Sequence, residues 1–201
     1  MSSRKAIMQL KEIRKLISGK ELVLAAEWPR KYQVLISTIL SAQTKDETTI
    51  RICKILFAKY PSMKSLAGGR LTSVEKMIRP INYHKTKARH ILATAKMLSG
   101  KKIPADIAGL ILLPGVGRKV GNVYLAEALK MDAIGVDTHV FRLSRKLGWS
   151  SGKTPHKVEK DLERLFPRKY WRDLNYVLVN FGRIYGRSRR VEDEMLNGLK
   201  S

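Results

Sequence analysis

Residues 112–142 read LLPGVGRKVGNVYLAEALKMDAIGVDTHVFR, and this stretch decides the fold. Two glycines, Gly115 and Gly117, interrupt an otherwise helical pattern. We predict a short helix that reaches Leu113, a tight turn through both glycines, and a second helix that begins at about Arg118. The amides at the start of that second helix would suit a phosphate group. An αα-corner that needs its glycines only for the turn is the alternative.

The composition points to a polyanionic partner. Forty Lys and Arg residues against 17 Asp and Glu residues give a formal net charge of +23. Solubility requires far less charge, so nucleic acid is the first partner to consider and an acidic membrane surface the second. The sequence has no apolar run of membrane-spanning length and no apolar core of signal-peptide type at its start. We expect a soluble, intracellular protein, cytoplasmic and nucleoid-associated if its source is prokaryotic.

Apolar residues recur at intervals of three and four along almost the whole chain, and no window alternates with period two. Glycine and proline residues separate the segments. The pattern predicts an all-α protein of nine or so short helices, without an internal repeat. The predicted helical segments fall within residues 7–17, 32–40, 46–60, 71–81, 86–100, 118–130, 139–148, 156–166 and 171–186.

Four motifs occur in a fixed order along the chain. They are LISTILSAQTKDETT (35–49), INYHKTKARHI (81–91), LPGVGRK (113–119) and LVNFGRIYG (178–186). The lysine that ends the third motif is followed 18 positions later by the aspartate of VDTHVFR. In order and spacing the chain resembles the helix-hairpin-helix DNA glycosylases, specifically their endonuclease III branch. The resemblance covers most of the sequence.

This resemblance implies a two-lobed helix-hairpin-helix glycosylase fold with the active-site cleft between the lobes. One lobe would hold six helices over residues 23–132 and end in the hairpin. The other would combine residues 1–22 with residues 133–201. Lys119 would then face Asp137 across the cleft.

The pair Lys119 and Asp137 suits cleavage of an N-glycosidic bond. Positive charge develops on the sugar as the bond breaks, and a fixed carboxylate stabilises it, which is the role expected of Asp137. A neutral lysine amine can attack the same carbon and form a Schiff base, the role expected of Lys119. We expect nearby cations and partial desolvation to lower the pKa of Lys119. The structural alternatives are a helix N-cap for Asp137 and a phosphate contact for Lys119.

A base inside a duplex must be flipped out before it reaches such a site, and the protein must fill the gap. By resemblance the wedge side chains are Gln43 and Tyr83. A helix-end glutamine and a core tyrosine are the structural alternatives, and His139 could equally be a structural histidine. The residues expected to contact DNA are Gln43, Tyr83, His84, Lys85, Lys87, Gly115, Gly117, Arg118, His139 and Arg142.

The chain departs from the resembled family at its C-terminal end. Most relatives carry four cysteines, spaced C-x₆-C-x₂-C-x₅-C, that bind a [4Fe–4S] cluster. Here the first three positions fall on Gly186, Asp193 and Leu196, and the fourth lies just past Ser201. The single cysteine, Cys53, is interpreted as a buried small hydrophobe. We expect no cluster and a tail that is held by packing or is partly disordered.

A different ion is implied at the hairpin, where the carbonyls of Ile111, Leu113 and Val116 would bind one monovalent cation. Arginines close to the missing cysteine positions could take over the DNA contacts of the loop that the cluster supports in relatives. These arginines are Arg183, Arg187, Arg189 and Arg190.

The leading hypothesis is a monomeric, bifunctional DNA glycosylase and AP lyase of base excision repair. It would remove oxidised pyrimidines of the thymine glycol type from double-stranded DNA and cleave the strand 3′ to the abasic site by β-elimination. One alternative is a glycosylase for uracil or thymine opposite guanine, or for 8-oxoguanine, since the fold does not determine the lesion. Another is a non-catalytic helix-hairpin-helix DNA-binding protein.

The high positive charge generates a first prediction. Affinity for undamaged duplex should fall steeply with salt, because phosphate contacts release counterions. With six such contacts, raising the salt concentration from 50 to 200 mM should weaken binding on the order of 10³-fold. Fluorescence anisotropy across that range measures the slope, and a nearly flat dependence would contradict a phosphate grip.

Overall fold

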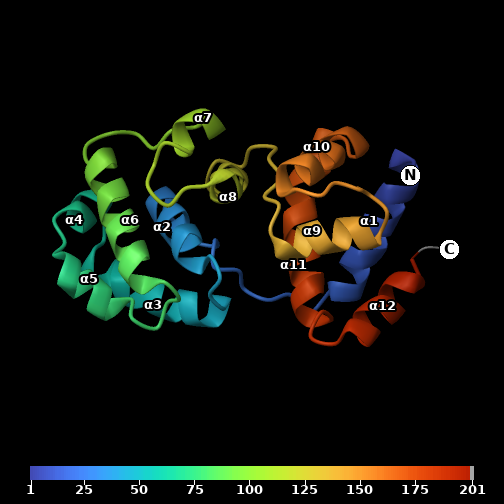
Figure 1. Ribbon diagram of the computed structural model, residues 1–201, viewed down its shortest axis with the longest axis horizontal. Coiled ribbons are helices and arrows are strands. Elements are labelled where there is room, and N and C mark those ends of the chain that lie inside the picture. The colour runs from blue at the N-terminus through green and yellow to red at the C-terminus, as the bar shows by residue number, and fades with distance from the viewer. Residues whose placement is uncertain (200–201) are drawn as a thin grey trace. The chain divides into compact units, whose positions relative to one another are not determined.

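The computed structural model describes residues 1–199, and the regular structure in that range is entirely helical, which confirms the predicted fold class. The helices gather into two compact units (Figure 1). The hairpin unit comprises Val23–Lys130, and the terminal unit comprises Met1–Leu22 and Met131–Ser201. The division falls two residues before the predicted one. Within residues 1–199, none of the helices has the length and apolar composition needed to span a bilayer.

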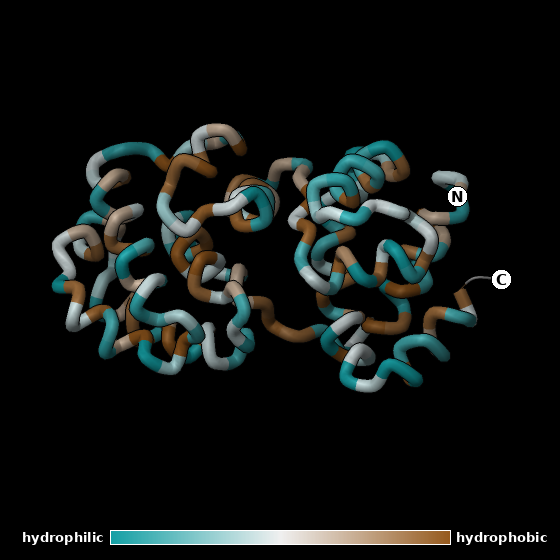
Figure 2. Tube along the Cα trace, in the orientation of Figure 1, coloured by the Kyte–Doolittle hydropathy of each residue, from teal (hydrophilic) through white to brown (hydrophobic). Residues whose placement is uncertain are grey.

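The hairpin unit is built around one buried helix, α2. Every residue of α2 from Val34 to Leu40 is buried, and a helix that is buried on all sides belongs in a core. It packs against α8, α3 and α6, and its trace is mostly hydrophobic in Figure 2. The helices of this unit are α2 (Lys31–Ser41), α3 (Asp46–Lys59), α4 (Met63–Ala67), α5 (Leu71–Met77), α6 (His84–Leu98), α7 (Ile107–Leu110) and α8 (Arg118–Ala128).

The terminal unit is organised by α11, which buries most of its residues between Leu174 and Gly182. The helix packs against α1 on one side and α9 on another. Trp149 stacks edge-on against Phe166, with 4.9 Å between ring centroids, and donates its Nε1 hydrogen to Gln9 Oε1 of α1 at 2.7 Å. The elements are α1 (Ser3–Ile17), α9 (Thr138–Lys146), α10 (Pro155–Leu165), the 3₁₀ turn η1 (Arg168–Tyr170), α11 (Trp171–Ile184) and α12 (Arg189–Asn197).

The structure corrects several predicted boundaries. The helix before the hairpin ends at Leu110 rather than Leu113, because the chain turns at Ile111. Residues 1–199 contain twelve α-helices rather than nine, and the hairpin unit contains seven rather than six. The short helix before the hairpin, α7, was predicted separately. The helices without a predicted counterpart are α4, which is short, and α12, which is strongly polar, so hydrophobic periodicity does not reveal them. The tail forms a helix, α12, that buries Glu192 and Leu196.

Candidate active site and DNA interface

The hairpin that connects α7 to α8 is held against α6. Thr94 of α6 donates its hydroxyl hydrogen to the carbonyl oxygen of Pro114 at 2.8 Å. Gly115 adopts φ +79°, and a Cβ at this position would lie 2.9 Å from the side chain of His90. Both the backbone angle and the close approach of α6 therefore require glycine. The next glycine, Gly117, is the N-cap of α8 and has no side chain to accept hydrogen bonds from the amides of that helix.

Arg118 and Lys119 are the first two residues of α8, and both side chains are half-buried. Amides in the first turn of a helix have no carbonyl acceptors within the helix, and they carry partial positive charge. The side chain of Lys119 therefore starts from a backbone segment that attracts anions. A phosphate bound at this helix end would bring the neighbouring sugar carbon close to the amine. The amine could then attack that carbon.

Asp137 is the N-cap of α9, which confirms the structural alternative for this residue. Its Oδ1 accepts the backbone amides of His139 at 2.9 Å and Val140 at 2.8 Å. Both capping bonds end on the same oxygen, so Oδ2 lies outside the cap. The cap fixes the carboxylate in place and is compatible with a second role for the remaining oxygen.

His139 and Arg142 have partners inside the protein. Arg142 donates to both carboxylate oxygens of Glu192, at 2.6 and 3.2 Å, and its Nη2 lies 3.5 Å from Nδ1 of His139. Burial lowers the pKa of His139 below its ordinary value, although the Asp137 charge opposes that shift. A structural role thus accounts for both side chains as they stand, and their contact with DNA remains a prediction.

Sequence reasoning missed Glu192. It lies four residues before Leu196, on the buried face of α12, and is 2% exposed. The four-residue spacing of Glu192 and Leu196 in a polar tail was the available signal for a helix that buries both residues. The position of Arg142 shows why a carboxylate is buried there.

The predicted wedge residues lie on two loops that are joined by hydrogen bonds. The side chain of Asn82 donates to the carbonyl of Gln43, and the amide of Asn82 donates to Thr44 Oγ1 at 3.2 Å. Gln43 and Tyr83 are both exposed, and both adopt left-handed backbone angles, with φ of 54° and 58°. Tyr83 is 66% exposed, so the alternative of a core tyrosine is wrong. Two such strained residues on joined loops are typical of functional sites.

Lys87 corrects one predicted DNA contact. The side chain is 6% exposed, and its ammonium group donates to the carbonyl of Leu40 at 2.7 Å, to the carbonyl of Ala42 and to Thr44 Oγ1 at 3.3 Å. These carbonyls end α2, where the helix dipole favours a cation. Burial lowers the pKa of Lys87 to about 8. Its charge therefore fixes the loop that carries Gln43 and does not face a phosphate.

The remaining predicted residues are positioned as follows. Lys85 is exposed and His84 is half-buried, both in the first turn of α6, where contact with DNA stays a prediction. The carbonyl of Leu113 accepts the amide of Val116 at 3.0 Å and keeps its second lone pair. The cation at Ile111, Leu113 and Val116 therefore also stays a prediction.

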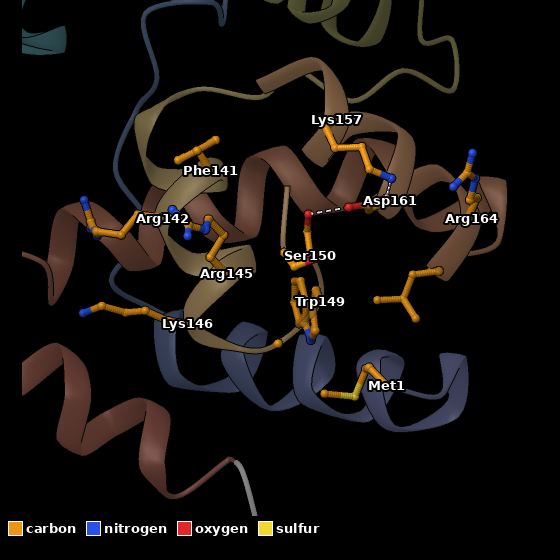
Figure 3. Close-up of a pocket in the computed structure, with 13 residues that line it drawn as sticks. Met1, Phe141, Arg142, Arg145, Lys146, Trp149, Ser150, Lys157, Asp161 and Arg164 are labelled. Carbon is orange, nitrogen blue, oxygen red and sulfur yellow. Dashed lines mark hydrogen bonds and ion pairs between the residues drawn. The ribbon is translucent and has the colours of Figure 1, made fainter. Parts of the chain in front are cut away.

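A basic cavity of about 1050 Å³ lies in the terminal unit, beside the C-terminal half of α9 (Figure 3). Asp161 in its wall accepts from Lys157 and from the hydroxyl of Ser150, both at 2.7 Å. Neither Lys119 nor Asp137 lines the cavity. Its basic residues are Arg142, Arg145, Lys146, Lys157 and Arg164.

A lysine directly behind a glycine hairpin, an aspartate that caps a later helix and an all-helical, strongly basic chain together define a helix-hairpin-helix protein of DNA repair. The model of one family, described as "HhH-GPD superfamily base excision DNA repair protein", matches residues 36–168. That range includes the hairpin, Lys119 and Asp137.

Relatives narrow the class further. The chain is 37% identical over 155 residues to endonuclease III of Thermotoga maritima, which covers 76% of this chain and 73% of the relative. It is 34% identical over 182 residues to endonuclease III of Synechocystis, covering 89% and 82%. The chain therefore belongs to the HhH-GPD superfamily, in its endonuclease III-like family.

Solved structures agree. The fold matches a trapped endonuclease III–DNA covalent intermediate with a TM-score of 0.86 and 31% identity, over 94% of this chain and 90% of the other. A thermostable thymine-DNA glycosylase matches with a TM-score of 0.80 over 93% and 90%, but at 20% identity that likeness shows the fold alone.

The role of Lys87 can be tested by stability. Lys87→Met keeps the apolar length of the side chain but leaves the last carbonyls of α2 without their donor. We expect the free energy of unfolding to fall by about 1–3 kcal/mol. Urea denaturation followed by circular dichroism measures the change. The matched control, Lys85→Met, removes an exposed lysine of the same helix turn and should stay within about 0.5 kcal/mol of the wild type. Equal effects of the two substitutions would contradict the structural role.

Proposed function

We propose that this chain, an endonuclease III-like DNA glycosylase of base excision repair, is bifunctional. It releases oxidised pyrimidines of the thymine glycol type from duplex DNA and then cleaves the strand 3′ to the abasic site. The observation that carries the proposal is the retention of both reactive groups, Lys119 in the first turn of α8 and Asp137 with one oxygen outside its cap.

Asp137 serves base release in this proposal. As the bond between C1′ and the base lengthens, positive charge spreads over C1′ and the ring oxygen of the sugar. A preorganised carboxylate stabilises this charge without reorganising during the reaction. The cap on α9 supplies the preorganisation, because it fixes one oxygen of Asp137 while the other remains for the sugar.

Lys119 serves the covalent steps. Its neutral amine attacks C1′, and the base departs with the bonding electrons and takes up a proton. Opening of the sugar ring gives a Schiff base between Lys119 and C1′. Loss of a proton from C2′ then expels the 3′ phosphate, and water hydrolyses the remaining imine to free the lysine. An endonuclease III that is 31% identical to this chain has been solved as a trapped covalent intermediate with DNA. That structure supports the same sequence of steps here.

DNA contacts complete the proposal. The hairpin at Gly115 and Gly117 would hold a phosphate, and Gln43 and Tyr83 would enter the space left by the flipped nucleotide. The tied loops of these two residues support this role, because both exposed side chains extend from backbone that hydrogen bonds hold in place. We retain His84, Lys85, Arg118, His139 and Arg142 as proposed contacts.

The lesion is tested directly by turnover on a panel of duplexes. Each duplex carries one thymine glycol, one uracil or thymine opposite guanine, or one 8-oxoguanine. The proposal requires the thymine glycol duplex to react fastest. Preference for another duplex would replace the substrate, and inactivity on all of them would favour a non-catalytic DNA-binding protein.

Lys119→Gln should abolish both borohydride trapping and strand cleavage, because it removes the only proposed nucleophile. Affinity for duplex DNA should change little, since one of 40 basic residues is lost. Gel electrophoresis of borohydride-treated reactions measures the adduct. The control Lys130→Gln removes a lysine with the same charge just after α8 and should trap as the wild type does. Continued trapping by Lys119→Gln would assign the nucleophile to another amine.

Asp137→Asn should separate the two activities. Asparagine is also a good N-cap, so α9 should persist. Base release should slow by about 10²- to 10³-fold, the order observed when one preorganised electrostatic partner is removed. Cleavage of a pre-formed abasic site should suffer less, because the base has already left. Single-turnover kinetics on the two substrates tests this, with Asp173→Asn, a half-buried carboxylate of the same unit that pairs with Arg14, as the control. Equal slowing of both reactions would contradict the assignment.

A further inference from the structure

The C-terminal segment does not fit the [4Fe–4S] cluster that most relatives carry. Four thiolates bind such a cluster, and this chain has one cysteine, Cys53, which is buried in α3 of the hairpin unit. The aligned positions fall on a glycine, an aspartate and a leucine. Contacts other than a cluster must therefore hold α12 in place.

A buried carboxylate joins α12 to α9. Glu192 of α12 is 2% exposed, and its two oxygens face Arg142 and Lys146 of α9, each with a closest contact of 2.6 Å. Lys146 also contacts Asp193 at 2.8 Å. In Figure 3 the side chains of Arg142 and Lys146 extend from α9 to the same side. Two cations one turn apart on α9 therefore meet two consecutive acids of α12.

The surrounding backbone is shaped for this contact. A Cβ on Gly186 would first meet the backbone carbonyl oxygen of Gly182, and it would also lie 2.8 Å from both Arg142 Nη2 and Glu192 Oε2. A Cβ on Gly182, one turn earlier, would clash with the ring of His139. The end of α11 thus carries glycine at the two points where the side chains of α9 pass. A larger residue at position 186 would therefore clash with the backbone of α11 and with the ion pair.

We propose that Glu192 is a positioning residue that ties α12 to α9 and thereby keeps the N-terminal turn of α9, with Asp137, in its reactive geometry. The proposal rests on the function proposed for Asp137. Its physical basis is that Glu192 is 2% exposed, whereas Arg142 and Lys146 are 38% and 27% exposed. A carboxylate buried this deeply keeps its charge only while both cations stay in contact with it, so the two ion pairs constrain α12 against α9. His139 transmits the constraint, because its ring lies between Arg142, Gly182 and the capped turn.

The tie should depend on pH. Burial of the Glu192 carboxyl opposes ionisation, but hydrogen bonds and charges from Arg142 and Lys146 outweigh it and hold the pKa below 4.5. The other ionisable groups near this carboxyl are His139 on α9 and Asp193 on α12. A carboxyl with a lowered folded pKa contributes stability above its unfolded pKa and loses it as pH falls through the folded value. The stability difference between wild type and Glu192→Gln should therefore be full near pH 7 and shrink below about pH 4.5.

The main experiment compares Glu192→Gln with Glu194→Gln. Glu194 lies on the same helix, 57% exposed, and pairs with Arg190. Glu192→Gln should slow base release from the thymine glycol duplex on the order of 10- to 100-fold, because small displacements of a catalytic group have large effects. Cleavage of a pre-formed abasic duplex by Lys119 should stay within about threefold, since abasic-site cleavage needs less from Asp137. Glu194→Gln should match the wild type in both reactions.

A second readout does not require base release. Trypsin should cleave after the exposed Arg189 faster in Glu192→Gln than in Glu194→Gln, because the ion pairs that hold α12 against α9 are lost. The conservative variant Glu192→Asp, shorter by one methylene group, should give an intermediate rate in both assays. It also keeps the test valid if Glu192→Gln does not fold.

Each result supports or overturns the inference. Unchanged base release in Glu192→Gln would contradict the positioning role. If the rates of both reactions fell equally and the melting temperature fell with them, Glu192 would be a stabilising residue only. Stoichiometric iron in the pure protein would contradict the inference that ion pairs, and not a cluster, hold α12 in place. A wild type that releases no base would refute the proposed function, while the trypsin assay would still report on the tie.

Discussion

A formal net charge of +23 constrains this fold more than any single contact, because folding brings like charges together. Seventeen acidic residues must moderate 40 basic ones, and several acids therefore bind more than one donor. Glu192 faces two cations, Asp161 accepts from a lysine and a serine, and Asp137 accepts two amides. The acids of the terminal unit thus have structural roles as well as charge, and Asp137, the proposed reactive carboxylate, is one of them.

The constraint also explains how basic residues are distributed between structure and surface. Lys87 is drawn into the hairpin unit by the carbonyls that end α2, where a cation is favourable. Exposed neighbours such as Lys85 remain at the surface. Position in the sequence does not distinguish these two lysines, because only one residue separates them.

Hydrophobic periodicity was sufficient for the long helices and the fold class, because burial of an apolar face determines them. It was insufficient for α12, whose buried face combines Leu196 with a charged residue. The cap at Asp137 could be predicted, since it depends on a local hydrogen bond. The partner of Arg142 could not, because Glu192 lies 50 residues away in sequence and only tertiary structure brings the two together. Lys119 and Asp137 were predicted from motif spacing and stay a proposal, whereas the buried position of Lys87 contradicted the same kind of inference.

The tied loops of Gln43 and Tyr83 have a consequence for the encounter with DNA. A flexible loop loses conformational entropy when it binds, and that loss weakens the complex. Here Asn82 and Lys87 already fix both loops in the folded protein, so this conformational entropy is lost during folding and not during binding. In the proposed wedge role, the two side chains would approach a duplex from backbone that is already in place. They could then test successive base pairs without a loop rearrangement at each one, and the resistance of the base stack would decide where they enter.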